Sequence, residues 1–281
     1  MPNFLGVGFY RCGSTWLHDL LDAHPRCFVP QEFKELHYFL PHVIGRGRGW
    51  YESFFPDDVG GYDAVGEVGP GYGEKGGLDA IAADPTLGSE GRFIFIARNH
   101  ADMLLSEHDQ RTLTRPDQPP FGDATMLAAC RERPLRFSGV VQPWLDRFGG
   151  DRVLLLTLEQ VKRDLPGTRE VIAHHLGLDP TLFPDDAGRG SSNVSGTPRF
   201  AVAYRLAARA NVWLVRRGLH RLSGRLRDAG LKRLFGFKPR DRTASPLTDD
   251  LRRQIAQVYA EDRRRMKGQG FDLTGWDGEP A

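Results

Sequence analysis

The chain has 281 residues with 40% hydrophobic side chains, enough to build the core of one large globular domain. Lysine plus arginine (38) nearly balances aspartate plus glutamate (36), so the net charge of +2 gives no global basis for a nucleic-acid partner, and we expect none. The three cysteines, Cys12, Cys27 and Cys130, lack a C-x-x-C spacing, which argues against a disulfide framework or a zinc site. With no leader pattern and no run of about 18 apolar residues, we expect a cytoplasmic protein without a transmembrane segment.

Short apolar runs alternate along the chain with helical patterns. The apolar runs predict buried strands at 4–8, 64–68, 92–97 and 152–157. The helical patterns predict helices at 14–23, 78–83, 101–112, 124–148, 167–176 and, with Thr248 as N-cap, 248–267. This alternation favours a single α/β domain over residues 1–281, with a central, mainly parallel sheet flanked by helices in three layers. Ligands of such sheets bind at the carboxyl ends of the strands, so the residues that follow each strand are the candidate site.

A glycine-rich turn, "GFYRCGSTW" (8–16), joins the first predicted strand to the first helix. It matches the phosphate-binding pattern G-x-x-x-x-G-K-[ST], except that Ser14 occupies the lysine position and Arg11 is the nearest cation. Backbone N–H groups at a helix N-terminus bind phosphate, and the hydroxyls of Ser14 and Thr15 could add donors. An ordinary tight turn with a surface arginine is the alternative.

A second cation follows another predicted strand, because "FIFIARN" ends in Arg98. A nucleoside triphosphatase needs an acidic residue there to hold magnesium, so the sequence disfavours a metal site. A P-loop kinase that uses ATP and magnesium and a noncatalytic nucleotide-binding scaffold remain the alternatives to the function considered next.

Two motifs resemble those of sulfotransferases that use 3′-phosphoadenosine 5′-phosphosulfate (PAPS). "RCGSTW" (11–16) is similar to their 5′-phosphosulfate loop, and "RNHADMLLS" (98–106) is similar to their 3′-phosphate motif. Three further segments resemble carbohydrate and bacterial members of the family, and the likeness covers roughly residues 3–199: "DAHPRCFVPQEFKELHYF" (22–39), "VVQPWLDRFGGDRVLLLTLEQV" (140–161) and "SSNVSGTPR" (191–199). The resemblance implies a P-loop-like fold and in-line, metal-independent transfer of a sulfuryl group to a hydroxyl of a small-molecule, lipid or glycan acceptor.

The resemblance also implies the residues that bind PAPS. Arg98 and Ser106 are expected at the 3′-phosphate, and Arg199 is expected to contact the cofactor without a motif of its own. Trp16 either packs near the adenine or anchors the core. The remaining residues form the loop around the 5′-phosphosulfate: Arg11, Cys12, Gly13, Ser14 and Thr15.

Three residues are candidates for catalysis. Glu35 in "KELHYF" aligns with the general base of the heparan-type enzymes, with His37 as the competing base and a surface pair with Lys34 as the alternative. Arg11 replaces the usual lysine, so it could stabilise the leaving phosphate but could not donate a proton. Val68 also replaces a lysine of those enzymes, which makes a polyanionic acceptor less favoured.

A basic stretch follows the best-matched region. Between residues 205 and 242 the chain carries twelve arginine and lysine residues against Asp228 and Asp241. We expect residues 200–245 to form a helical segment over the acceptor side; a solvated face, an anionic membrane surface or a contact in a homo-oligomer are alternatives.

Overall fold

The computed structural model describes residues 1–31, 34–114, 120–122, 124–132, 137–189, 196–198, 237–239 and 247–276. Its centre is a five-stranded sheet of order β2-β3-β1-β4-β5 in which all neighbouring strands are parallel. The strands of this sheet are β1 (Phe4–Gly8), β2 (Cys27–Phe28), β3 (Ala64–Val68), β4 (Arg92–Ala97) and β5 (Val153–Thr157). A separate antiparallel pair is formed by β6 (Gly196–Pro198) and β7 (Phe237–Pro239).

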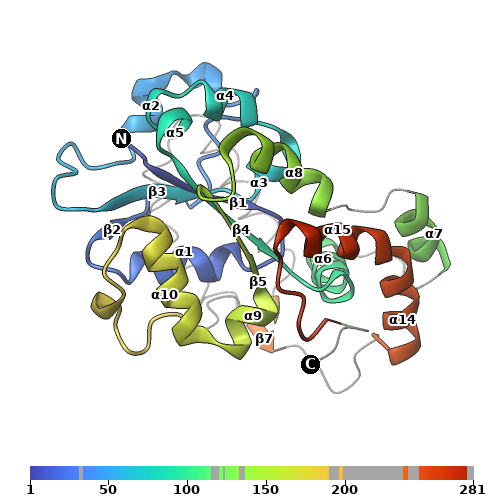
Figure 1. The fold of residues 1–281 in the computed structure, drawn as a ribbon. Helices are drawn as coiled ribbons and strands as arrows, with labels where there is room; N and C mark the ends of the chain where they lie inside the picture. Colours follow the sequence, from blue (N-terminus) through green and yellow to red (C-terminus); the bar gives the residue numbers. More distant parts are fainter. Residues whose placement is uncertain are drawn as a thin grey trace.

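Helices cover both faces of the sheet, so the three-layer α/β architecture predicted from the sequence is confirmed (Figure 1). One face is covered by α1 (Ser14–Asp22) and α10 (Leu165–Leu176), which follows α9 (Leu158–Arg163). The other face packs against α2 (Arg48–Glu52), α4 (Leu78–Ala82), α5 (Pro85–Ser89) and α8 (Phe137–Phe148). The remaining helices are α3 (Gly71–Lys75), α6 (His100–Thr114), α7 (Ala124–Glu132), α14 (Asp249–Val258) and α15 (Ala260–Gln269), with short 3-10 turns η1 (Ile44–Arg46) and η2 (Pro180–Leu182).

The alternation of side chains along β4 explains why the sheet needs both layers. Phe93 and Phe95 point to one face and lie 5.2 and 5.4 Å from the indole of Trp144 on α8. Ile94 and Ile96 point to the opposite face, into the core beneath α1 and α10. All four side chains are at most 4% exposed, as expected for a central strand of a parallel sheet.

Two predicted helices are wrong as single elements. The helix expected at 124–148 is two helices, α7 and α8, and Pro134 between them in the sequence lacks the N–H that a continuous helix needs. The helix expected at 248–267 breaks at Tyr259 into α14 and α15, although Thr248 is its N-cap and accepts a hydrogen bond from the N–H of Leu251. At this break the ring of Tyr259 stacks on the buried imidazole of His100, with 4.1 Å between the ring centroids, so a tertiary contact accompanies the interruption of the helix.

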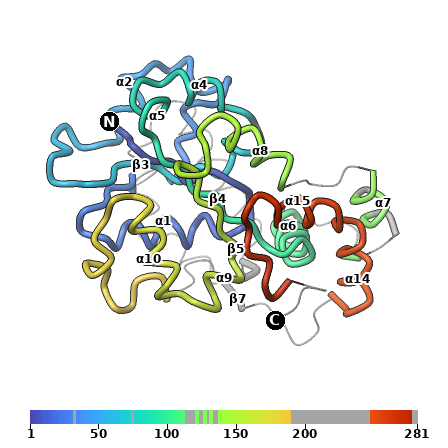
Figure 2. The backbone as a smooth tube through the Cα atoms, viewed as in Figure 1, coloured from blue at the N-terminus to red at the C-terminus, as the bar shows by residue number. Residues whose placement is uncertain are grey.

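The C-terminal helices pack beside α6 and α7, although they lie more than 100 residues away in the sequence (Figure 2). Leu251 and Ile255 of α14 share an apolar cluster with Leu104 of α6 and with Met126 and Leu127 of α7. No helix among these described residues is long and apolar enough to cross a membrane. The basic segment expected at 200–245 lies outside the described residues apart from β7.

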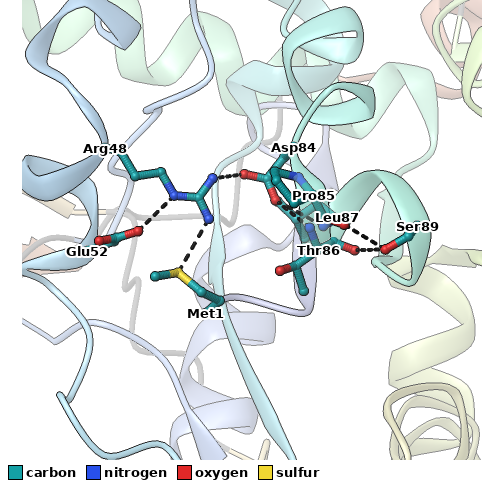
Figure 3. Close-up of polar contacts among 8 residues, drawn as sticks. All are labelled: Met1, Arg48, Glu52, Asp84, Pro85, Thr86, Leu87 and Ser89. Atoms are coloured by element: carbon teal, nitrogen blue, oxygen red, sulfur yellow. Dashed lines mark hydrogen bonds and ion pairs between the residues drawn. The ribbon is translucent and has the colours of Figure 1, made fainter.

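Arg48, the first residue of α2, links this helix to the N-cap of α5 (Figure 3). Its Nη1 pairs with Asp84 Oδ2, its Nε with Glu52 Oε1 at 2.8 Å, and its Nη2 with Met1 Sδ at 3.3 Å. Asp84 is 6% exposed and also accepts hydrogen bonds from the N–H groups of Thr86 and Leu87 as the N-cap of α5. The arginine therefore neutralises a buried carboxylate.

We expect Arg48→Ala to destabilise the fold by about 1–3 kcal/mol, because the substitution leaves the buried Asp84 without its cation. Urea unfolding measures this loss. Arg253→Ala is the matched control: Arg253 pairs with Asp250 where both side chains are 68% exposed, so its loss should be within about 0.5 kcal/mol. Equal effects of the two substitutions would contradict the role given to Arg48.

Candidate active site at the carboxyl edge of the sheet

The candidate site lies where β1 and β4, which are neighbours in the sheet, end at its carboxyl edge. The chain leaves β1 toward β2 on one side of the sheet and leaves β4 toward β5 on the other. Such a point of divergence opens a crevice in which α/β proteins bind ligands. The loop after β1 carries Arg11, and Arg98 directly follows β4.

The loop after β1 presents the N-terminus of α1. Gly8 (φ 133°), Arg11 (φ 66°) and Gly13 (φ 101°) adopt positive φ, so the chain turns sharply before the helix begins at Ser14. No side chain caps this end of α1, and no acidic residue lies in its first turn. The first N–H groups and the helix dipole are therefore suited to an anion.

The structure brings together the two arginines and the serine that the sequence placed in separate motifs. Arg11 Nε donates to Ser106 Oγ at 3.0 Å, and Arg98 Nη1 donates to the carbonyl of Arg11 at 3.4 Å. Burial, and then repulsion by Arg98, lower the pKa of Arg11. Arg98 Nε is buried and has no hydrogen-bond partner among the described residues. Two neighbouring cations and an unused buried donor fit a phosphate group.

Trp16 and Cys12 play different parts in this loop. The indole N–H of Trp16 donates to the carbonyl of Gly188 at 3.0 Å, so Trp16 anchors α1 to the segment after η2. This contact is the anchoring role weighed from the sequence, and the packing against adenine stays a prediction. The side chain of Cys12 is 1% exposed and lies in the core, so only its backbone can face a ligand.

The two candidate bases lie together at the end of the loop that follows β2. Glu35 Oε2 is 3.8 Å from His37 Nε2, and their side chains are 35% and 17% exposed. The imidazole packs edge-on against the rings of Tyr72 at 5.7 Å and Tyr10 at 6.4 Å. His37 has a φ of 54°, a conformation that non-glycine residues rarely adopt.

Glu67 on β3 is a buried residue of this region to which the sequence reasoning gave no role. Its carboxylate accepts hydrogen bonds from the N–H groups of Leu36 at 2.9 Å and His37 at 3.4 Å, and from the hydroxyl of Tyr72 at 2.6 Å. Burial raises its pKa to about 7, although these donors favour the ionised form. The signal that could have found it is a glutamate inside an otherwise apolar strand, "AVGEV".

We expect this raised pKa to make the stability of the fold depend on pH. The folded-state pKa of Glu67 lies above the unfolded value of 4.5, so its contribution is fully present below about pH 4.5 and is lost as pH rises through about 7. The loss amounts to about 3 kcal/mol at most. Urea unfolding of the protein and of Glu67→Gln between pH 5 and 8 measures it; parallel pH profiles would contradict the assignment.

Glu159, at the start of α9, supports the backbone beside Arg98 and was also missed. It accepts the N–H of Asn99 at 3.3 Å and the indole N–H of Trp276 at 2.9 Å. Burial raises its pKa, offset in part by backbone hydrogen bonds and by the charges of Lys162 and Arg98. No pattern in the sequence links residues 99, 159 and 276, because only the tertiary fold brings them together.

Three other expectations concern the edges of the site. Arg199 lies outside the described residues. Val68, where heparan-type enzymes carry a lysine, is 1% exposed in the core. Within the described ranges, no three His, Cys, Asp or Glu side chains are grouped as metal ligands.

Known proteins resemble this chain in sequence and in fold, although no protein-family model matches it. Human bifunctional heparan sulfate N-deacetylase/N-sulfotransferase 2 is 24% identical over 222 residues, which cover 70% of this chain and 25% of that protein. The bovine protein of the same name is 23% identical over 223 residues, with the same coverage. The chain thus spans about a quarter of the length of these curated relatives.

Among solved structures, a sulfotransferase from Alicyclobacillus acidocaldarius matches 98% of both chains, with a TM-score of 0.62 and 21% identity. This structural likeness shows the fold. The sequence similarity to the curated relatives points to the same class of protein. The resemblance first drawn from the motifs at 11–16 and 98–106 is confirmed. In sequence and in fold, the chain thus resembles PAPS-dependent sulfotransferases.

Proposed function

We propose that the protein transfers a sulfuryl group from PAPS to a hydroxyl of a small-molecule, lipid or glycan acceptor. The observation that carries this proposal is the cluster of Arg11, Arg98 and Ser106 beside the uncapped N-terminus of α1. Arg98 and Ser106 suit the 3′-phosphate that distinguishes PAPS from ATP, and Arg11 with the adjacent helix end suits its 5′-phosphosulfate.

The donor, when bound, supplies a sulfuryl group on a phosphate leaving group. In our proposal Glu35 accepts the acceptor's hydroxyl proton as the acceptor oxygen bonds to sulfur. The bond between sulfur and the phosphate oxygen breaks, and the negative charge on that oxygen is stabilised by Arg11 and by the N–H groups of Gly13, Ser14 and Thr15. The guanidinium of Arg11 keeps its proton throughout, so the leaving group departs as an anion.

Two observations support proposals about the chemical character of the acceptor and the cellular location of the protein. The surroundings of Glu35 include the partly exposed His37, whose ring lies edge-on to that of Tyr10, and these two rings suit an acceptor with an apolar or ring-shaped body. The cysteines Cys12, Cys27 and Cys130 are all buried, which suits a reducing compartment and supports a cytoplasmic location.

Transfer of ³⁵S from labelled PAPS to a panel of phenols, sugars, lipid alcohols and amines tests the proposal. We expect label on at least one acceptor with the intact protein and none with Arg11→Ala. If PAPS binds but no acceptor of any class is labelled, the protein is a nucleotide-binding scaffold and the proposal is wrong.

A further inference from the structure

We infer that Glu67 is a positioning residue for sulfuryl transfer, which fixes the backbone between Glu35 and His37 at the carboxyl edge of the sheet. The inference rests on the proposed function for its catalytic consequence. Its structural part, that one buried carboxylate holds this loop, stands on the contacts alone.

Glu67 is 0% exposed and lies one residue before the end of β3. Its Oε2 accepts the N–H of Leu36 at 2.9 Å and that of His37 at 3.4 Å. These two residues directly follow Glu35, so a single carboxylate oxygen on the rigid sheet holds the chain that carries both candidate bases. Loop residues without such an anchor would sample many conformations, whereas proton transfer needs the base at a fixed place.

The second carboxylate oxygen of Glu67 connects this part of the loop to neighbouring helices. Oε1 accepts the hydroxyl of Tyr72 on α3 at 2.6 Å, and Tyr72 Oη in turn faces the N–H of Phe39 at 3.5 Å. Tyr51 of α2 is fully buried, stacks on Tyr38 at 4.5 Å and lies close enough to Glu67 for each group to affect the other's pKa. The loop is therefore held at residues 36, 37 and 39 by one buried polar network.

This network also fixes the ring of His37. The residue has a φ of 54°, which is strained for a side chain with a Cβ, and its N–H bond to Glu67 holds that conformation. The imidazole lies against Gly71, where an added Cβ would come within 2.7 Å of His37 Nε2 and 2.6 Å of Tyr10 Oη. The imidazole ring is therefore confined on the side that faces Gly71.

A buried carboxylate is a poor choice for stability alone, because a well-packed apolar side chain of similar volume is often equally stable or better. The backbone N–H groups of Leu36 and His37 explain why a hydrogen-bond acceptor is needed at position 67. Removal of the Glu67 carboxylate should therefore release the loop that carries Glu35 and His37, while the phosphate-binding cluster that follows β1 and β4 stays in place.

The test compares Glu67→Leu, which keeps volume but removes the acceptor, with Glu67→Gln, whose amide oxygen still accepts the loop N–H groups. We expect Glu67→Leu to lower kcat at least about tenfold while the thermal shift caused by 3′-phosphoadenosine 5′-phosphate (PAP) is unchanged, and Glu67→Gln to restore most of the rate. Glu90→Leu, the same change at an exposed position at the opposite edge of the sheet, is the matched control. An unchanged kcat in Glu67→Leu, or loss of the PAP-induced shift together with the rate, would overturn the inference.

If Glu67→Leu does not fold, hydrogen exchange of the unaltered protein tests the anchor instead. The amides of Leu36 and His37 should be protected as strongly as amides of the sheet, and exchange at the rate of an open loop would overturn the anchor. This measurement needs no acceptor and no PAPS. A protein that binds no PAP but protects both amides would refute the proposed function and leave the anchor intact.

Discussion

Glu35→Gln should reduce sulfuryl transfer about 10²- to 10⁴-fold while PAP binds with unchanged affinity. A positioned general base contributes a factor of this size, and glutamine has nearly the same shape but cannot accept the acceptor's proton. The Glu35 side chain is 35% exposed, so we expect its replacement by glutamine to leave the fold unaltered. Initial rates with saturating PAPS, together with PAP titrations, measure both quantities.

His37 provides the discriminating comparison, since its Nε2 lies 3.8 Å from the Glu35 carboxylate. If Glu35 is the base, His37→Asn should lower the rate less than Glu35→Gln does. Should Glu35→Gln remain active and His37→Asn lose the rate, the base is His37 and our assignment is wrong. Glu90→Gln, remote from the site, controls for the change of charge.

Arg98→Ala should weaken PAP binding by about 10- to 150-fold and leave ADP affinity within about threefold. Hydrogen bonds to a charged group contribute about 1.5–3 kcal/mol, and Arg98 Nε is a buried donor with no partner among the described residues. ADP lacks the 3′-phosphate and so should not use this contact. Titration calorimetry with the two nucleotides gives the ratio directly.

Arg92→Ala is the matched control for Arg98, because Arg92 is an exposed arginine at the opposite end of the same strand. It should bind both nucleotides as the unaltered protein does. Equal loss of PAP and ADP affinity in Arg98→Ala would mean that Arg98 serves the part of the site common to both nucleotides, and the 3′-phosphate assignment would fail.

The sequence predicted the sheet and the phosphate cluster because both depend on local patterns. Buried strands such as β1 and most of β4 are continuous apolar runs, and a parallel sheet necessarily brings the residues that follow its strands to one edge. Arg11 and Arg98 could therefore be placed in one site from their positions after β1 and β4. The strand β2 was missed because two residues are too short for any periodicity.

Other features could not be predicted because they depend on contacts between distant residues. Helix propensity does not reveal that the chain breaks at Tyr259 to stack its ring on His100. Likewise, Glu67 and Glu159 act through backbone N–H groups of residues 31 and 60 positions away, for which a sequence gives no signal. Trp16 shows the same limit, since its partner is a backbone carbonyl 172 residues further along the chain.

The central claim is that the cluster of Arg11, Arg98 and Ser106 is built for a nucleotide with a 3′-phosphate. Thermal unfolding with PAP, with ADP and with ATP plus magnesium, each at the same concentration, tests it most directly. A ligand at about 100 times its Kd stabilises the folded state by about 2.7 kcal/mol, so PAP should raise the midpoint by roughly 5–10 °C and ADP far less. A shift with ATP and magnesium that equals or exceeds the shift with PAP would contradict the claim and favour a kinase.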